Sequence, residues 1–218
     1  MSTLLLKNLN TLVTCDDADS VLRSVDVYCE DGFIRAIGPH LPQTADAVID
    51  GTHYWCYPGL VNTHHHLYQV FSRNLPQVQN MELFDWLTTL YEIWKNLDAD
   101  VIRLSSLTGM GELMKHGCTT CFDHHYVFPA GAGDLLGAQF AAAEELGIRM
   151  FASRGSMDLS KKDGGLPQML WQVHRTEVRP SWPCLISAFR LQRIHIMLML
   201  TEGWKRRPPL YGPIALLN

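Results

Sequence analysis

A short apolar run that leads into two histidines constrains the fold of this chain more than any other feature. The run covers residues 57–61 and contains a Pro-Gly turn, and His64 and His66 follow it one residue apart. Side chains at positions i and i+2 of a β-strand point the same way, so both imidazoles can face one metal ion. We therefore expect a buried strand whose carboxyl end carries paired metal ligands, where parallel β/α barrels keep their chemistry.

Alternating strand and helix patterns extend along the chain from residue 55. Apolar residues at helical spacing, Asp98 as an N-cap candidate and a glycine after two of the helices give the boundaries. Units of this length that alternate strand and helix indicate an α/β fold with a parallel sheet. The expected helices are Met81–Leu97, Asp98–His116 and Asp134–Leu146, and the expected strands are Thr119–Val127 and Ile148–Ser153.

Residues 1–54 predict a separate small β-sheet unit. Short β-rich runs alternate with turn residues, and Asp31-Gly32 is a good hairpin turn between two of them. The expected strands are Thr3–Leu6, Leu12–Cys15, Val25–Cys29, Phe33–Ile37 and Ala47–Asp50.

Five motif segments lie at residues 58–66, 66–69, 82–94, 122–129 and 153–160. Together they resemble the amidohydrolase superfamily, in the deaminase branch that contains 8-oxoguanine deaminases and hydroxylated-triazine aminohydrolases. The resemblance covers about residues 1–167. It implies a distorted (β/α)8 barrel, of which this chain holds the first three βα units after the small β-sheet unit. It also implies that strands from the far C-terminus complete that sheet.

The pattern changes near residue 168, so we divide the chain into 1–54, a barrel part at 55–167 and a non-family tail at 168–218. Residues 166–218 contain 7 of the 18 basic side chains but 2 of the 22 acidic ones, and 6 of the 11 prolines. We expect the tail not to be natively folded, and we attribute it to a frame change or truncation near codon 168. A divergent but genuine C-terminal region is the alternative, which sequencing the locus would test.

Composition excludes several classes of protein. The chain has 218 residues, 47% hydrophobic and 18% charged, which is typical of a globular protein, and its net charge of -4 argues against nucleic-acid binding. The absence of a signal-like start or a long apolar run predicts a cytoplasmic protein that does not bind membranes.

The six cysteines form no regular framework. Cys118-x-x-Cys121 could indicate zinc or redox chemistry, but it has no second pair.

The resemblance implies hydrolytic deamination of an oxidised purine such as 8-oxoguanine, or of a related heterocycle, by metal-hydroxide attack on the amino-bearing ring carbon. His64 and His66 would hold one divalent metal ion, zinc first and iron as the alternative. The small-molecule substrate would be the main partner, and a homo-oligomer stays open for the intact enzyme. The family's later ligands, two histidines and an aspartate, and its glutamate proton shuttle cannot be assigned here. His195 with Glu202 echoes them but follows the third strand too soon.

Four other side chains are candidates for substrate binding. Gln69 follows the histidine pair and can donate to and accept from a lactam edge, although an exposed loop glutamine fits equally. Of the two histidines after the second strand we favour His125 as the one facing the pocket, with a core or loop histidine as the alternative. Arg154 can bind a carbonyl oxygen or form a structural ion pair. Trp86 is a candidate for stacking on a base, although the pattern around it is mostly core.

Two further functional hypotheses compete with deamination. Half of the expected metal and catalytic residues cannot be found, so the chain can be an inactive truncated or frame-shifted fragment of such an enzyme. It can also be a binding module that associates with an intact paralogue. An open sheet of three parallel strands exposes edges and an apolar face, which predicts poor solubility for the fragment.

Overall fold

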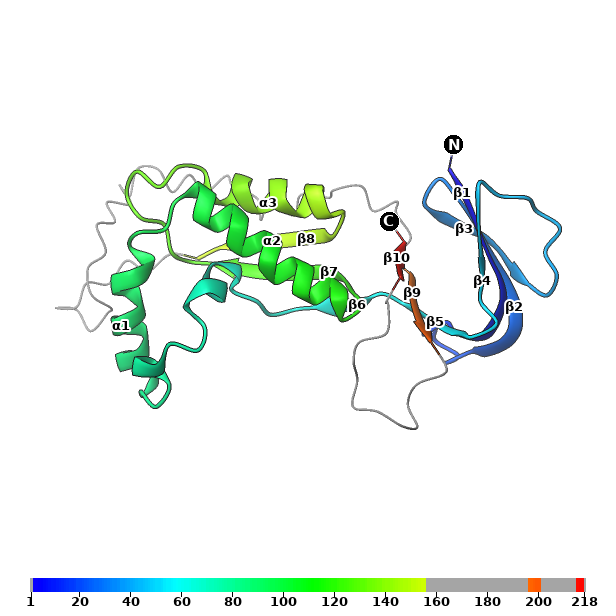
Figure 1. The fold of residues 1–218 in the computed structure, drawn as a ribbon, viewed down its shortest axis with the longest axis horizontal. Helices are drawn as coiled ribbons and strands as arrows, with labels where there is room; N and C mark the ends of the chain where they lie inside the picture. The colour runs from blue at the N-terminus through cyan, green and yellow to red at the C-terminus, as the bar shows by residue number, and fades with distance from the viewer. Residues whose placement is uncertain (1, 156–195, 201–214, 218) are drawn as a thin grey trace. The chain divides into compact units, whose positions relative to one another are not determined.

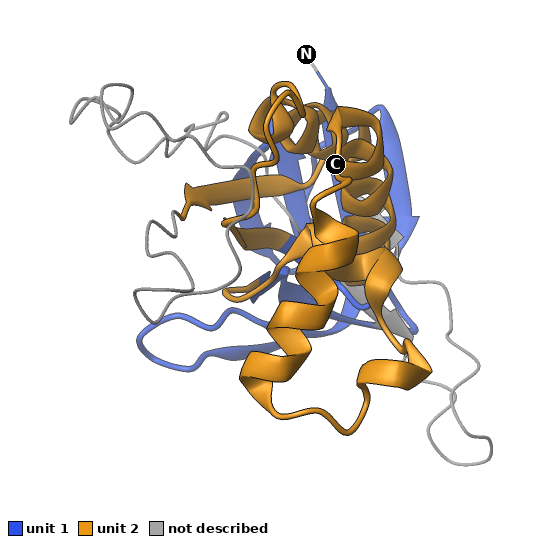
Figure 2. Cartoon of the chain, turned by 90° about the vertical axis from the view of Figure 1, so that its left-hand side faces the viewer, with its two compact units in different colours: residues 1–61, 114–119, 188–218 blue, residues 62–113, 120–187 orange. Residues whose placement is uncertain are grey.

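The computed structural model describes residues 2–155, 196–200 and 215–217. The chain divides into two compact units, which are described separately below and coloured differently in Figure 2. The first contains residues 1–61, 114–119 and 188–218, and the second contains residues 62–113 and 120–187. None of the described helices combines the length and apolar character that crossing a membrane requires.

The first unit is built on a twisted sheet with strand order β10-β9-β5-β1-β2-β3, in which β4 also pairs with β1 (Figure 1). Its core contains buried leucines and valines together with the thiols of Cys29 and Cys56. Burial raises the pKa of these thiols to about 11 and about 12, respectively. The N-terminal strands are β1 Thr3–Val13, β2 Val21–Glu30, β3 Phe33–Gly38, β4 Ala47–Asp50 and β5 Tyr54–Pro58.

The strand β1 is continuous where the sequence predicted two strands. Its pairing with β2 shifts register between Leu6 and Leu9, and Asn8 has φ 57° at this point. The buried Asp26 accepts a hydrogen bond from the Asn8 N–H at 2.7 Å, so the bulge keeps its backbone donor satisfied and the strand continues. The predicted hairpin turn is confirmed, because Asp31 and Gly32 have φ 49° and 83°, as a type I′ turn requires.

Two segments of the tail are strands of the same sheet. The strand β9 Ile196–Leu200 pairs antiparallel with β5, and β10 Ala215–Leu217 pairs antiparallel with β9. We expected residues 168–218 not to be natively folded, and this stays a prediction. The edge of β5 presents unpaired backbone N–H and C=O groups that a following strand can satisfy. The other residues of the tail lie outside the described residues.

The second sheet has strand order β6-β7-β8, with β7 and β8 parallel. This pairing of parallel strands with intervening helices confirms the predicted α/β class. The strands are β6 Leu60–Asn62, β7 Cys118–His125 and β8 Arg149–Arg154, and the helices are α1 Leu83–Trp94, α2 Ala99–Lys115 and α3 Leu135–Leu146. Two 3-10 helices, Leu67–Ser72 and Pro76–Val78, precede α1.

The helix ends lie within a few residues of those predicted from capping signals. The Asp98 carboxylate accepts from the Val101 N–H at 2.8 Å, and the Asp134 carboxylate accepts from the Gly137 N–H at 2.9 Å. Gly147 ends α3 in the left-handed region at φ 75°. Side-chain oxygens at these positions satisfy backbone donors that the first helical turn leaves open.

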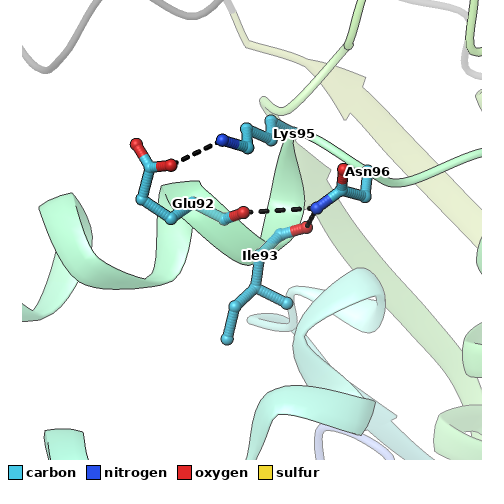
Figure 3. A network of polar contacts seen from close by, with 4 residues as sticks. All are labelled: Glu92, Ile93, Lys95 and Asn96. Atoms are coloured by element: carbon cyan, nitrogen blue, oxygen red, sulfur yellow. Dashed lines mark hydrogen bonds and ion pairs between the residues drawn. The ribbon is translucent and has the colours of Figure 1, made fainter.

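The helix α1 ends earlier than predicted, and side chains near its end satisfy its last carbonyls (Figure 3). The Asn96 amide donates to the Glu92 carbonyl at 3.2 Å and to the Ile93 carbonyl at 3.1 Å. Lys95 forms an exposed ion pair with the Glu92 carboxylate at 2.6 Å. The helix therefore ends where the Asn96 side chain satisfies carbonyls that the N–H groups of another helical turn would otherwise satisfy.

A second core contains the buried face of α1 and the 3-10 segment before it. Trp94 and Tyr68 are almost fully buried, with ring centroids 5.1 Å apart in an edge-to-face contact. The Trp94 indole N–H donates to the Ser72 hydroxyl at 3.0 Å, so its burial leaves no unpaired donor. This core includes Tyr68, which follows His66 by two residues.

Replacing Asp134 by alanine should destabilise the chain by about 1 kcal/mol, because α3 loses its N-terminal cap. Urea denaturation followed by circular dichroism measures this change. Glu144→Ala removes an exposed carboxylate from the same helix and serves as the matched control. Equal stability of the two variants would contradict a capping role for Asp134.

Candidate metal centre

The histidine pair lies in the loop after β6 and not on the strand itself. The strand ends at Asn62, and His66 has φ -134° and ψ 80°, outside the helical and strand regions. The expectation that strand alternation aligns the pair is therefore corrected, although the two side chains do converge. Their Nε2 atoms lie 3.3 Å apart and their ring planes are 82° apart.

The separation of the two Nε2 atoms fits a shared tetrahedral metal ion. Two nitrogens bound tetrahedrally to zinc at about 2.05 Å are separated by about 3.3 Å. The observed 3.3 Å between the His64 and His66 Nε2 atoms agrees with this value. The same distance also suits a hydrogen bond from one ring to the other, so the geometry alone fits both arrangements.

The backbone around the site selects one tautomer of His66. Its Nδ1 lies 2.8 Å from the carbonyl oxygen of His124. A carbonyl can only accept, so we assign the proton to Nδ1, which leaves the Nε2 lone pair directed toward His64. Metal-binding histidines usually donate their second ring N–H in this way, which makes His66 suited to a metal ion.

The carboxyl end of β7 holds the loop that carries the pair. The His124 N–H donates to the His65 carbonyl at 2.9 Å, and the Leu67 N–H donates to the Asp123 carboxylate at 2.6 Å. Burial raises the pKa of Asp123 to about 6, although its hydrogen bonds from Leu67 and Gln139 oppose the shift. The loop is therefore attached to the strand on both sides of His66.

His124 and His125 are the last two residues of β7, and our expectation favoured His125 as the one facing the pocket. His125 is fully buried, and its Nε2 donates to the Val127 carbonyl at 2.7 Å. Its neighbour His124 is partly exposed, with its ring centroid 6.0 Å from that of His66. Alternation along β7 explains the difference, because His125 shares a face with the buried Asp123.

The other three predicted substrate residues lie in different surroundings. The Gln69 amide donates to the hydroxyls of Tyr68 and Tyr126 at 3.2 Å each, which leaves its carbonyl oxygen available. Trp86 packs on Trp94 with ring centroids 5.6 Å apart, as a core residue does. Arg154 is exposed and lies over the Phe128 ring, with its guanidinium carbon 4.4 Å from the centroid. Substrate contact by these residues stays a prediction.

Sequence reasoning missed two residues beside the pair. The Tyr126 ring lies edge-to-face against His66, with centroids 5.2 Å apart. The Ser153 hydroxyl is 2.5 Å from His124 Nδ1. The parallel register pairs His124 with Ser153, and Tyr126 follows His124 by two residues, so a correct register would have indicated both.

The described part of the chain supplies no third ligand beside the pair. No group of three or more His, Cys, Asp or Glu side chains that could hold a metal ion occurs among the described residues. Both cysteines of the Cys118-x-x-Cys121 motif are buried in β7. His195 and Glu202 lie outside the described residues.

Gly109 of α2 allows the histidine loop to pack closely on that helix. A Cβ atom at this position would lie 2.7 Å from Leu67 Cδ2 and 3.0 Å from Val70 Cγ2. Burial, with smaller contributions from neighbouring positive charges, lowers the pKa of His65, whose ring lies beside this contact. The small residue thus sets how near the loop approaches the helix.

Comparison with known proteins identifies the relatives of this chain. The amidohydrolase family matches residues 55–189, further than residue 167, where we ended the resemblance. The 8-oxoguanine deaminase of Pseudomonas aeruginosa is 39% identical over 170 residues, which are 77% of this chain and 37% of that protein. Hydroxydechloroatrazine ethylaminohydrolase of Pseudomonas sp. strain ADP is 39% identical over 177 residues, 75% of this chain and 37% of that protein.

A solved structure agrees with these relatives. Atrazine chlorohydrolase from Arthrobacter aurescens TC1, complexed with zinc, aligns with a TM-score of 0.69 at 32% identity, over 77% of this chain and 39% of that one. The chain belongs to the amidohydrolase family, as its motifs predicted. It spans about 37% of the length of the curated relatives it matches.

Replacing Gly109 by alanine should destabilise the chain by about 1–3 kcal/mol, because the added methyl group overlaps two packed side chains. Gly111→Ala is the matched control on the same helix, since a Cβ there meets nothing within 4 Å. The control should be stabilised by about 0.5–1 kcal/mol through helix propensity. Urea denaturation of both variants tests the contrast, which an equal response would contradict.

Burial lowers the pKa of His125 to about 4, which predicts a pH-dependent loss of stability. The unfolded histidine takes up a proton at about pH 6.5, before the folded one does. Stability from this group is therefore complete above about pH 6.5 and is lost as the pH falls to about 4, by about 3 kcal/mol in total.

The variant His125→Phe should lack this component of the profile, because phenylalanine does not titrate. Urea denaturation between about pH 4 and about pH 7 gives the difference between the two profiles. All other titrating groups are shared by both chains. A constant difference across the range would contradict the assignment.

Proposed function

We propose that His64 and His66 form part of the metal shell of a hydrolytic deaminase. The observation that carries the proposal is the convergence of their Nε2 atoms, 3.3 Å apart, with His66 Nδ1 held by the His124 carbonyl. A pair of loop histidines with a purely structural role would not need the hydrogen bond that holds His66 Nδ1 to the His124 carbonyl. The donor set suits zinc, with iron as the alternative, because imidazole nitrogens bind both.

A divalent ion at this site would supply a nucleophilic oxygen at neutral pH, by lowering the pKa of water to about 7. The residues of this chain would orient the ion and the heterocycle. His66 is fixed through its Nδ1 hydrogen bond, and Gln69 has an amide oxygen available for a ring N–H. His124 replaces His125 as the histidine that we assign to the substrate side.

The proposed substrate is an oxidised purine such as 8-oxoguanine, or a related heterocycle. Two relatives that are each 39% identical over at least 75% of this chain are an 8-oxoguanine deaminase and a hydroxydechloroatrazine ethylaminohydrolase. In the proposed reaction water attacks the amino-bearing ring carbon and ammonia leaves. We assign no proton donor for that ammonia among the described residues.

We further propose that residues 55–167 are the first three βα units of a (β/α)8 barrel. The parallel pairing of β7 with β8, the histidines after β6 and the histidines at the carboxyl end of β7 support this. Side chains at the carboxyl ends of neighbouring strands would then meet at one edge, as barrel active sites require.

A non-catalytic fragment is the second candidate function. A catalytic zinc usually has three protein ligands and an open position. The described residues supply a pair at this site and no group of three. These observations favour a chain that retains half of a metal shell without the activity.

Zinc binding and ammonia release together test the proposal on the whole chain. His64→Ala and His66→Ala should each weaken zinc binding by at least about 100-fold, because loss of a ligand costs more than loss of a group behind one. His53→Ala, an exposed histidine of the first unit, is the control and should bind as the parent does.

The same preparations should be incubated with 8-oxoguanine and assayed for ammonia. Zinc-dependent ammonia release that both site variants abolish would establish the deaminase. Zinc binding without release would establish the fragment. Binding that neither site variant weakens would contradict a metal centre at the pair.

A further inference from the structure

Asp123 connects three separate segments of the second unit through one buried carboxylate. Its side chain is fully buried at the carboxyl end of β7. One oxygen accepts from the Leu67 N–H at 2.6 Å, and the other accepts from the Gln139 amide at 2.9 Å. Burying a carboxylate is costly, so both hydrogen bonds are needed to retain it.

Gln139 is a polar residue on the buried face of α3. It is fully buried, and the neighbouring buried positions of that face include Leu135, Ala142 and Ala143. Its Nε2 donates to Asp123, while its Oε1 has no hydrogen-bond partner among the described residues. A buried amide whose oxygen has no partner is unfavourable for stability alone. Its placement therefore points to a role in orienting Asp123.

The group that Asp123 holds is the peptide directly after His66. Anchoring the Leu67 N–H fixes the peptide plane that follows His66, whose ψ is 80°. On the other side, the His65 carbonyl accepts from the His124 N–H at 2.9 Å. With both flanking peptides fixed, the His66 ring is held where its Nδ1 reaches the His124 carbonyl at 2.8 Å.

We propose that Asp123 and Gln139 are positioning residues for His66, which hold its backbone so that Nε2 faces the metal ion. The inference rests on the proposed metal centre and adds to it two residues that do not touch the metal. Through them, the buried face of α3 is linked to the histidine loop. Neither residue contacts the reacting atoms, so their effect passes through His66.

Asp123→Ala and Asp123→Asn separate this role from simple packing. Alanine leaves the Leu67 N–H and the Gln139 amide without the carboxylate, whereas asparagine keeps an oxygen for Leu67. The asparagine N–H can also donate to Gln139 Oε1 if that amide rotates, which uses the atom that now lacks a partner. Zinc affinity should fall about 10–100-fold in Asp123→Ala and should be largely restored in Asp123→Asn.

The tautomer of His66 gives a second measurement that needs no metal. Long-range proton–nitrogen correlation spectra of the whole chain should show the proton on Nδ1 in the parent and in Asp123→Asn. The alanine variant should show a mixture of tautomers, because the ring loses its fixed position relative to the His124 carbonyl. A general loss of stability that leaves the folded site unchanged would not alter the tautomer.

Each outcome bears on the inference in a defined way. A folded Asp123→Ala chain with parental zinc affinity and tautomer would overturn it and leave the metal centre intact. Absence of zinc binding by the parent chain would contradict the proposed function, while the tautomer would still test the positioning role. If Asp123→Ala does not fold, Gln139→Leu replaces it, and an unchanged tautomer and affinity in that variant would overturn the inference.

Discussion

Hydrogen bonds between the end of β7 and the loop after β6 determine how the candidate site is arranged. The loop has neither helical nor strand geometry at His66, so its conformation depends on tertiary partners. The backbone and carboxylate of β7 supply these partners at His65, His66 and Leu67. A strand that is itself fixed by parallel pairing with β8 thus fixes a loop that has no regular structure.

Local signals in the sequence predicted the parts of the fold that depend on neighbouring residues. Asp98 caps its helix as predicted, and Asp31-Gly32 forms its hairpin turn, because each acts on residues within a few positions. The bulge in β1 was missed because it depends on Asp26, which is 18 positions away from Asn8. A partner so far along the chain leaves no trace in the residue pattern of β1 itself.

In the candidate site, too, the features that depend on nearby residues were predicted and those that depend on distant residues were not. The motif identified His64 and His66 as a pair, although the strand geometry behind that prediction was incorrect and the loop brings them together instead. The motif left open which of His124 and His125 is buried, and the structure buries His125, while contact of either with substrate stays a prediction. Tyr126 and Gln139 were missed because aromatic and amide residues at helix or strand spacing look like ordinary core residues.

The N-terminal sheet contains buried thiols that differ in reactivity from an exposed thiol beside it. Cys29 and Cys56 lie in the sheet core with pKa values raised to about 11 and about 12, whereas Cys15 is exposed. Because the thiolate is the reactive form, an alkylating reagent near neutral pH reaches Cys15 first and the buried pair only when the sheet opens. The rate at which the buried pair is modified therefore reports opening of the N-terminal sheet.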